Sequence, residues 1–240
     1  ALLCVTANTM LGVKGGLFMF ESNDVYGRTK SEGAIVSDST YNLVIGLVLC
    51  WGFLINWLIV RYVSTTWIKG IDIRIFLLVY FASCFYGVYL FNKSSDPSIS
   101  FAGYNFVVVP FGFVVNVVVS RYDPSLVLEA IRITACVTIV MMILGSLYPQ
   151  FFQAIFGPLV IALLALIIVE LVQIFFFHRV PEWIDWAVGA AFCGYIGYDW
   201  GRAQRIPKTV DNAVDSAAAI YMDVINLFLR ILRILGRRRR

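Results

Sequence analysis

The chain has 240 residues, of which 60% are apolar and 14% are charged, and its formal net charge is +4. Ordinary soluble domains are roughly 45–50% apolar and about 25% charged, so this composition excludes a soluble globular domain and a disordered protein. Nucleic-acid binding is not expected either, because the four terminal arginines, residues 237–240, account for the whole net charge. We therefore expect an all-α polytopic membrane protein whose main partner is the lipid bilayer.

Seven runs are long and apolar enough to cross about 30 Å of hydrocarbon as helices, which takes about 20 residues. The connections between them are short, so successive helices should be antiparallel neighbours. Strands are not expected, since the runs are about twice the length of a membrane-barrel strand and lack its two-residue alternation. The predicted spans cover residues 42–60, 71–91, 101–120, 126–148, 151–175, 182–199 and 212–235.

These spans define the domain organisation. Residues 1–38 are predicted to form a polar, irregular N-terminal tail, residues 39–236 a seven-helix transmembrane domain, and residues 237–240 a basic C-terminal tail. The terminal arginines either anchor the topology or bind anionic lipids. The basic residues on the two sides of the spans nearly balance, so the positive-inside rule leaves the orientation open. The membrane also stays open, between a bacterial plasma membrane and an organelle such as the mitochondrial inner membrane or the endoplasmic reticulum.

A charged side chain inside a span costs roughly 2.5 kcal/mol or more, so each one needs an explanation. Glu170 lies deep in an apolar run without a local partner, which predicts that it faces the bundle interior in a structural or a functional role. Glu129 and Arg132 lie three residues apart on one helix face and are expected to form a structural pair. Charges close to span ends are expected at the interface: Asp72, Arg74, His178, Glu182 and Asp185.

Two aspartates in the last quarter of the chain are candidates for a functional site. Asp199 closes the sixth predicted span, and Asp223 lies in the middle of the seventh. Because these two helices form a hairpin, the carboxyl groups can approach each other. The small residues 216–219 permit close helix packing, which suits a helix at the centre of a bundle. One face of this last helix collects polar and small residues at a 3-4-3-4 spacing, namely Ser216, Ala219, Asp223, Asn226 and Arg230.

Two carboxylates close together in a low dielectric cannot both ionise at low cost, so the pair would titrate as a unit. Doubly charged, the pair would repel and open, and with a proton it would close. Its oxygens would also suit a hard cation such as Ca²⁺, bound transiently at Asp199 and Asp223, with no other cofactor expected. The alternative is that each aspartate only bonds to the backbone or to an arginine.

The same region resembles the transmembrane Bax inhibitor motif family, also called the Bax inhibitor-1 family. The resemblance is carried by residues 220–229, Ile-Tyr-Met-Asp-Val-Ile-Asn-Leu-Phe-Leu, followed by Arg233 and Gly236. Tyr198-Asp199 at the end of the sixth span, the run Val-Leu-Glu-Ala at 127–130, and the 24-residue separation of the two aspartates also match. Specific motif residues lie in the last 45 or so positions.

This resemblance implies a seven-helix bundle with the C-terminal helix at its centre. It also implies a pH-dependent calcium leak in which Asp199 and Asp223 sense protons. A basic residue at the end of the second span would latch onto Asp199, and Lys93 stands nearest to that place. Where the family usually has glutamine after the sixth span, this chain has Arg202. Arg202, Arg205 or Arg230 could therefore neutralise an aspartate, while Asn226, Ser216, Glu129 and Glu170 are expected to support the site.

Two other classes of function compete with the leak. An enzyme is not expected, because the serine-protease and zinc-protease motifs are absent, as is the Gly-x-Gly-Asp motif of intramembrane aspartyl proteases. A non-conducting membrane scaffold, or an assembly or regulatory protein of the same fold with a protein partner, remains as the alternative.

Overall fold

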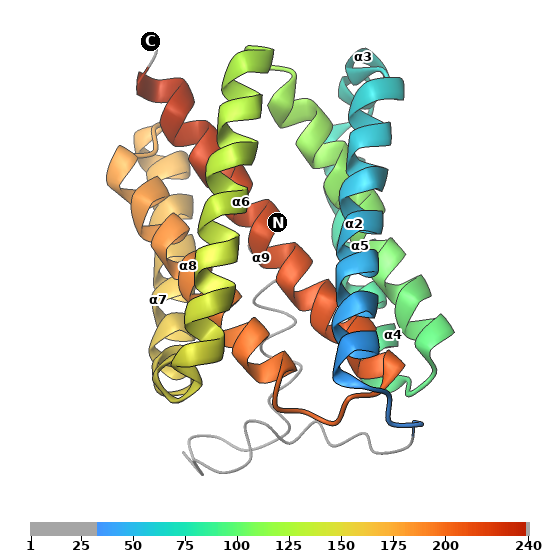
Figure 1. The fold of residues 1–240 in the computed structure, drawn as a ribbon. Coiled ribbons are helices and arrows are strands. Elements are labelled where there is room, and N and C mark those ends of the chain that lie inside the picture. Colours follow the sequence, from blue (N-terminus) through green and yellow to red (C-terminus); the bar gives the residue numbers. More distant parts are fainter. Residues whose placement is uncertain (1–32, 239–240) are drawn as a thin grey trace. The chain divides into compact units, whose positions relative to one another are not determined.

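The structure is a computed structural model that describes residues 33–238. Within that range the chain forms helices and one isolated β-bridge, between Ile35 and Thr209 (Figure 1). Most of the predicted N-terminal tail lies outside the described residues. The helices are α2 (Asp38–Tyr62), α3 (Thr65–Lys69), α4 (Ile73–Lys93), α5 (Pro97–Val119), α6 (Pro124–Leu147), α7 (Pro149–Phe177), α8 (Glu182–Ala203) and α9 (Val210–Arg238).

Five of these helices, α2 and α4 to α7, are long and apolar enough to cross a membrane. The all-helical, multi-pass architecture is therefore confirmed, but the count of seven spans is not. Helices α8 and α9 form where the sixth and seventh spans are predicted, yet neither is among the five. The physical reason is their polarity, because α9 alone carries three aspartates and four arginines. The short α3 was not expected, since its residues read as a connection.

The chain divides into two compact units. The N-terminal unit consists of described residues 33–121 and 202–221, and the C-terminal unit consists of described residues 122–201 and 222–238. Helix α9 contributes its first part to the N-terminal unit and its remaining part to the C-terminal unit. The two motif residues Tyr221 and Asp223 therefore belong to different units.

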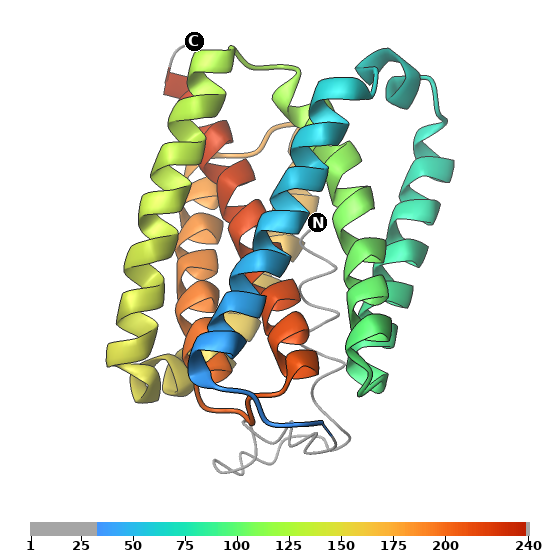
Figure 2. The same ribbon diagram turned by 45° about the vertical axis from the view of Figure 1, so that its right-hand side comes forward.

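In the N-terminal unit, α5 packs against α2 and α4 (Figure 2). Helix α5 contains Pro110, which has no backbone N–H to donate to the carbonyl of Phe106 four residues earlier. The hydroxyl of Ser83 on α4 donates to that carbonyl at 2.7 Å. A serine on a neighbouring helix thus satisfies the acceptor that the proline leaves open, as membrane helices require.

The first part of α9 is fixed in the N-terminal unit by aromatic packing. Tyr221 is fully buried, and its hydroxyl accepts a hydrogen bond from the amide of Asn56 on α2 at 2.6 Å. The rings of Tyr104 and Phe111 on α5 pack edge-on against the ring of Tyr221. Every polar atom in this set of contacts is uncharged. Neutral hydrogen bonds and ring packing therefore hold this part of the helix.

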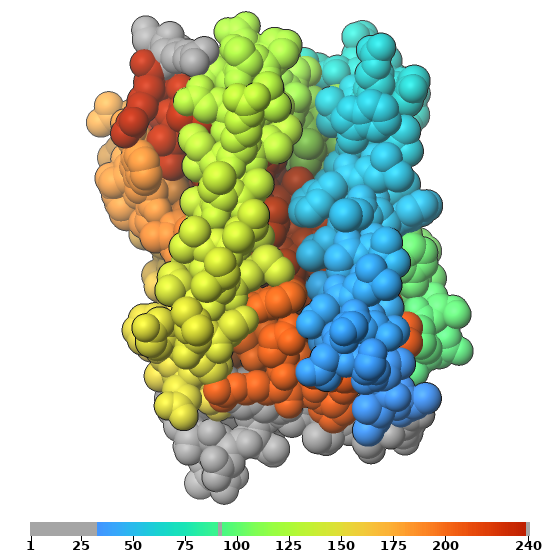
Figure 3. Space-filling model, in the orientation of Figure 1, coloured from blue at the N-terminus to red at the C-terminus, as the bar shows by residue number. Residues whose placement is uncertain are grey.

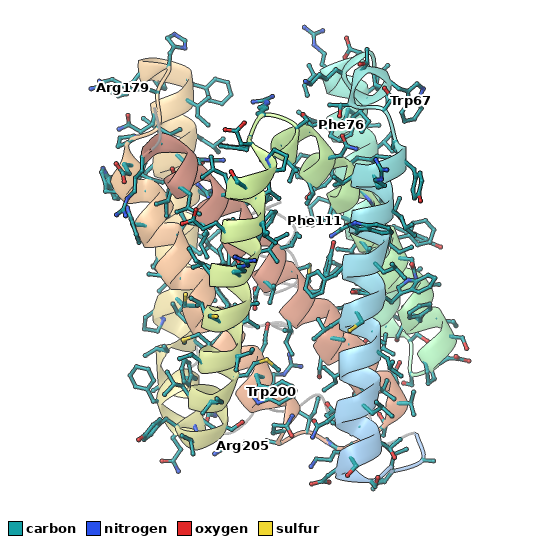
Figure 4. The ribbon with its side chains drawn as sticks, turned by 45° about the horizontal axis from the view of Figure 1, so that its top comes forward. Trp67, Phe76, Phe111, Arg179, Trp200 and Arg205 are labelled. Carbon is teal, nitrogen blue, oxygen red and sulfur yellow. The ribbon has the colours of Figure 1, made fainter. Side chains whose placement is uncertain are left out.

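In the C-terminal unit, α6, α7 and α8 lie around the second part of α9 (Figure 1). The side chains of α6 form part of the surface of this unit (Figure 3). Gly197 and Gly201 lie one turn apart on α8 and meet Gly145 of α6. A Cβ atom added at Gly201 would lie 2.8 Å from the Gly145 carbonyl oxygen, so only glycine permits this approach. Trp200 (Figure 4) donates to the Ser146 hydroxyl at 2.8 Å. These contacts fix α8 on either side of Asp199.

Candidate functional site

Local sequence signals set the start of α9 and the end of α7, the helix that precedes α8. The Thr209 hydroxyl accepts from the backbone N–H of Asn212 at 3.1 Å and so caps the start of α9. Helix α7 ends at Phe177, and the next residue, His178, has a φ of 52°, the left-handed conformation typical of a helix C-terminus. A short connection that includes Arg179 (Figure 4) and Pro181 then leads into α8. The chain thus returns to place Asp199 and Asp223 on adjacent helices of one unit.

Within the C-terminal unit, the carboxyl group of Asp199 lies close enough to that of Asp223 for the two to interact. A hydrogen bond between two carboxyl groups needs a proton, so one of them donates as the acid while the other accepts. Asp223 is 1% exposed, and Asp199 is half-buried. Oδ2 of Asp223 is buried and has no hydrogen-bond partner among the described residues. The approach expected from the hairpin is therefore present, while the proton-sensing role remains a prediction. We refer to these two residues as the aspartate pair.

The supporting residues on α9 bond elsewhere. Asn226 is buried and donates its amide to the carbonyl of Met222 on its own helix, at 2.6 Å. Ser216 is buried in the N-terminal unit, where its hydroxyl lies 3.2 Å from the hydroxyl of Tyr41. The shared polar face is thus buried as expected, but no contact with the aspartate pair is recorded for either residue.

The structure also gives the surroundings of three other predicted site residues. Lys93 is exposed and donates to the hydroxyl of Tyr89, one turn earlier on α4, at 2.7 Å. Arg202 is half-buried in the N-terminal unit, and its Nε atom has no hydrogen-bond partner among the described residues. Glu129 is half-buried on α6, and Arg132 is exposed. The latch by Lys93 and the neutralising role of Arg202 remain predictions.

A second set of buried charges lies in the same unit, and we call it the arginine cluster. Arg230 is 5% exposed and donates from Nη2 to Glu170 Oε2 at 2.7 Å and from Nη1 to Asp185 Oδ1 at 2.8 Å. Arg233 donates to Glu170 Oε1 at 3.0 Å and to Asp185 Oδ1 at 3.1 Å. Arg237 reaches Asp185 Oδ2 at 3.0 Å. Three arginines of α9 therefore bind one acid of α7 and one acid of α8.

The arginine cluster corrects three expectations. Asp185 was expected at the interface, but it is 0% exposed because three arginines enclose it. Arg237 was assigned to a basic tail, whereas α9 continues to Arg238 and ion pairs use Arg237. Arg230 was considered as a partner of the aspartate pair, but its recorded partners are Glu170 and Asp185. The expectation that Glu170 faces the interior is confirmed by its 8% exposure.

A signal in the sequence could have revealed this cluster. Arg230, Arg233 and Arg237 follow a 3-4 spacing and therefore share one helix face. A buried acid without a local partner, such as Glu170, requires a cation from another helix. These two observations together predict that the three arginines pair with Glu170. The participation of Asp185 had no comparable signal, since its position close to a helix start is equally typical of an interfacial charge.

The two sets of acids differ in what they can do chemically. Arginine stays protonated throughout the accessible pH range, so the arginine cluster keeps its charges. The aspartate pair brings two acids together, and two neighbouring carboxyl groups can share a proton. In the described part of the chain, no group of three or more His, Cys, Asp or Glu side chains is arranged to hold a metal ion.

The similarity to known proteins agrees with these features. The family model described as "Inhibitor of apoptosis-promoting Bax1" matches residues 35–240, which is most of the chain. The chain belongs to the Bax inhibitor family. Membership in this family covers both units, because the match runs from before α2 to beyond α9. The family resemblance seen in the motif around Asp223 is thereby confirmed, as is an integral multi-pass membrane location.

Individual relatives come from distant eukaryotes. The chain is 32% identical over 130 residues to "Bax inhibitor 1" of Schizosaccharomyces pombe, an alignment that covers 52% of this chain and 47% of the relative. It is 31% identical over 122 residues to "Protein lifeguard 4" of Mus musculus, covering 50% and 51% of the two chains. A "BI1-like protein" of Arabidopsis thaliana is 31% identical over 138 residues, covering 53% and 51%. The chain thus spans about half the length of the curated relatives it matches.

Proposed function

We propose that this Bax inhibitor family protein is a pH-sensitive calcium leak whose gate is the aspartate pair. The observation that carries the proposal is the approach of the Asp199 carboxyl group to the buried carboxyl group of Asp223 in the C-terminal unit. In this proposal a shared proton keeps the two carboxyl groups together. Removing that proton places two negative charges side by side in a low dielectric, which drives the helices apart.

The same step creates a place for a divalent cation. Two ionised carboxylates supply up to four oxygen atoms, whereas Ca²⁺ takes six to eight oxygen ligands. Water must provide the rest, so binding at the aspartate pair is weak and brief. Weak binding is what a conducting pathway requires, because an ion that binds tightly does not leave. The absence of a richer acidic group in the described residues supports a passage site over a storage site.

The test is calcium entry into liposomes that contain the full chain, followed with a trapped indicator across pH 5 to 9. We expect flux to rise with pH in the wild type and Asp223→Asn to abolish the pH dependence. Asp123→Asn is the matched control, because Asp123 is an exposed aspartate of the same unit that caps no backbone N–H with its side chain. Flux no greater than in empty liposomes at every pH would overturn the leak.

That negative result would favour the alternative function, a non-conducting membrane scaffold or regulatory protein. The arginine cluster supports this alternative, because it fixes α7, α8 and α9 to one another through buried ion pairs. A leak requires α8 and α9 to separate at the aspartate pair while the arginine cluster stays closed.

A further inference from the structure

A buried tyrosine lies beside the aspartate pair. Tyr195 precedes Asp199 by four residues on α8, so the two side chains lie on the same face of the helix. Tyr195 is 2% exposed, and its hydroxyl is buried without a hydrogen-bond partner among the described residues. A phenol in such a position is costly, because it has given up its water without gaining an acceptor. Few tyrosines are left in this state unless an acceptor is close by.

The matching acceptor is in the same site. Oδ2 of Asp223 is a buried carboxylate oxygen that also has no hydrogen-bond partner in the described part of the chain. Asp223 and Asp199 are the charged groups that act on the Tyr195 hydroxyl through space. One unsatisfied donor and one unsatisfied acceptor therefore share a single buried region of the C-terminal unit. Such complementary atoms indicate a hydrogen bond that forms in another protonation state of the site.

We propose that Tyr195 is a positioning residue of the aspartate pair and donates its hydroxyl hydrogen to Asp223 when the pair has lost its shared proton. The proposal rests on the function proposed above. In the protonated state, the proton between Asp199 and Asp223 provides the hydrogen bond. After its release to solvent, the hydroxyl of Tyr195 provides a replacement donor and keeps its own proton. No covalent bond forms or breaks apart from the loss of that one proton.

Groups from three helices surround Tyr195. Tyr198 is the other titratable group on α8 that acts on it. Helix α7 contributes the ring of Phe156, whose centroid is 6.3 Å from that of Tyr195, and its charged residue Glu170 is already bound to Arg230 and Arg233. Helix α6 meets α8 through the backbone of Gly145. The hydroxyl of Tyr195 is thus an unused buried donor near the place where a second negative charge would form.

This role has a measurable consequence for the proton affinity of the aspartate pair. A hydrogen bond to the ionised state favours that state, so the pair releases its proton at a lower pH with Tyr195 than without it. We expect Tyr195→Phe to move the midpoint of proton release upward by about one pH unit, the size expected for one hydrogen bond to a charged group. Replacing Tyr195 by 3,5-difluorotyrosine, a stronger donor, should move the midpoint downward.

The test is a pH titration of the carboxylic-acid band in the infrared spectrum of the full chain in lipid. Asp223→Asn identifies the band of the pair by removing it. Tyr80→Phe is the matched control, because it removes a hydroxyl from a buried tyrosine of the other unit. An unchanged midpoint in Tyr195→Phe would overturn the role of Tyr195 while leaving the aspartate pair in place. A band that Asp223→Asn does not remove would overturn both proposals.

Flux measurements separate the two proposals further. If Tyr195→Phe shifts the infrared midpoint while calcium flux is absent at every pH, the hydrogen bond exists and the leak does not. Circular dichroism and size-exclusion profiles equal to the wild type confirm that the variant is folded. The difluorotyrosine protein, which keeps the hydroxyl and every carbon atom of the side chain, provides the second measurement.

Discussion

The C-terminal unit contains two sets of acids, one on α7 and α8 and the other on α8 and α9, and their partners differ. In the arginine cluster, Glu170 and Asp185 face three guanidinium groups, and every contact joins opposite charges. In the aspartate pair, the recorded interaction joins two acids to each other. A fixed cation makes the first set indifferent to pH, whereas the function proposed above makes the second set sensitive to pH through a shared proton. Burial alone therefore does not make an acid a sensor, because the nature of its partner decides.

The spacing of residues on α9 explains how one helix contributes to both the aspartate pair and the arginine cluster. Asp223, Arg230 and Arg237 are separated by seven residues each, which is close to two turns. The acid and the arginines thus follow one stripe, with about 10 Å of rise between successive members. On α8, Asp185 meets the arginine end of the stripe and Asp199 meets the acidic end. Ion pairs therefore hold the end of the α8–α9 hairpin that contains the arginine cluster, and we call it the charge-locked end. The aspartate pair lies at the other end of the stripe.

The largest expected effect comes from breaking the charge-locked end. Arg230→Met leaves two buried acids with fewer cations, and removing one partner of a buried ion pair costs roughly 3–5 kcal/mol. We expect the free energy of unfolding, measured by denaturation in detergent at pH 7, to fall by about that amount. Arg132→Met removes an exposed arginine of α6 and should change it by less than about 0.5 kcal/mol. If the free energy of unfolding fell by less than about 1 kcal/mol, Arg233 and Arg237 would be enough to neutralise the two buried acids.

The second prediction concerns the pH dependence of stability. The folded aspartate pair holds a proton that exposed aspartates, with pKa values near 3.9, have already released above about pH 5. Because the folded state then binds more protons than the unfolded state, the free energy of unfolding should fall as pH rises, by up to about 1.4 kcal/mol per pH unit. Thermal unfolding at a series of pH values should show this slope in the wild type and not in Asp199→Asn or Asp223→Asn. The same slope in all three proteins would place its origin elsewhere.

The smallest effect tests whether the charge-locked end has spare cations. The side chain of Arg237 is 32% exposed, and Asp185 keeps two other arginines when Arg237 is replaced. Arg237→Gln should therefore lower the free energy of unfolding by about 1 kcal/mol, well below the loss in Arg230→Met. Arg238→Gln is the matched control, since Arg238 lies next in the chain and packs over the ring of Trp186. Equal losses in Arg237→Gln and Arg230→Met would show that no cation of the cluster is dispensable.

The sequence predicted some parts of this site well and others poorly, and the difference has a physical cause. The approach of Asp199 to Asp223 followed from local facts, because a short connection forces two consecutive helices into a hairpin. The partners of Glu170 lie 60 and 63 residues away on α9. Asp185 had a plausible local explanation as an interfacial charge, which hid its pairing with Arg230. Long-range pairing depends on which helix faces meet, and a single sequence does not state this.

The amino-acid sequence by itself determined that the chain is a helical multi-pass membrane protein. Its 60% apolar content and long apolar runs allow no soluble alternative, since hydrocarbon demands that each backbone satisfy its own hydrogen bonds. The tertiary structure alone decided which acids pair with arginines and which acid lies beside another acid. That distinction depends on the side chains that α7 and α8 present to α9, because the charge state of a buried group is set by its neighbours and not by its own type.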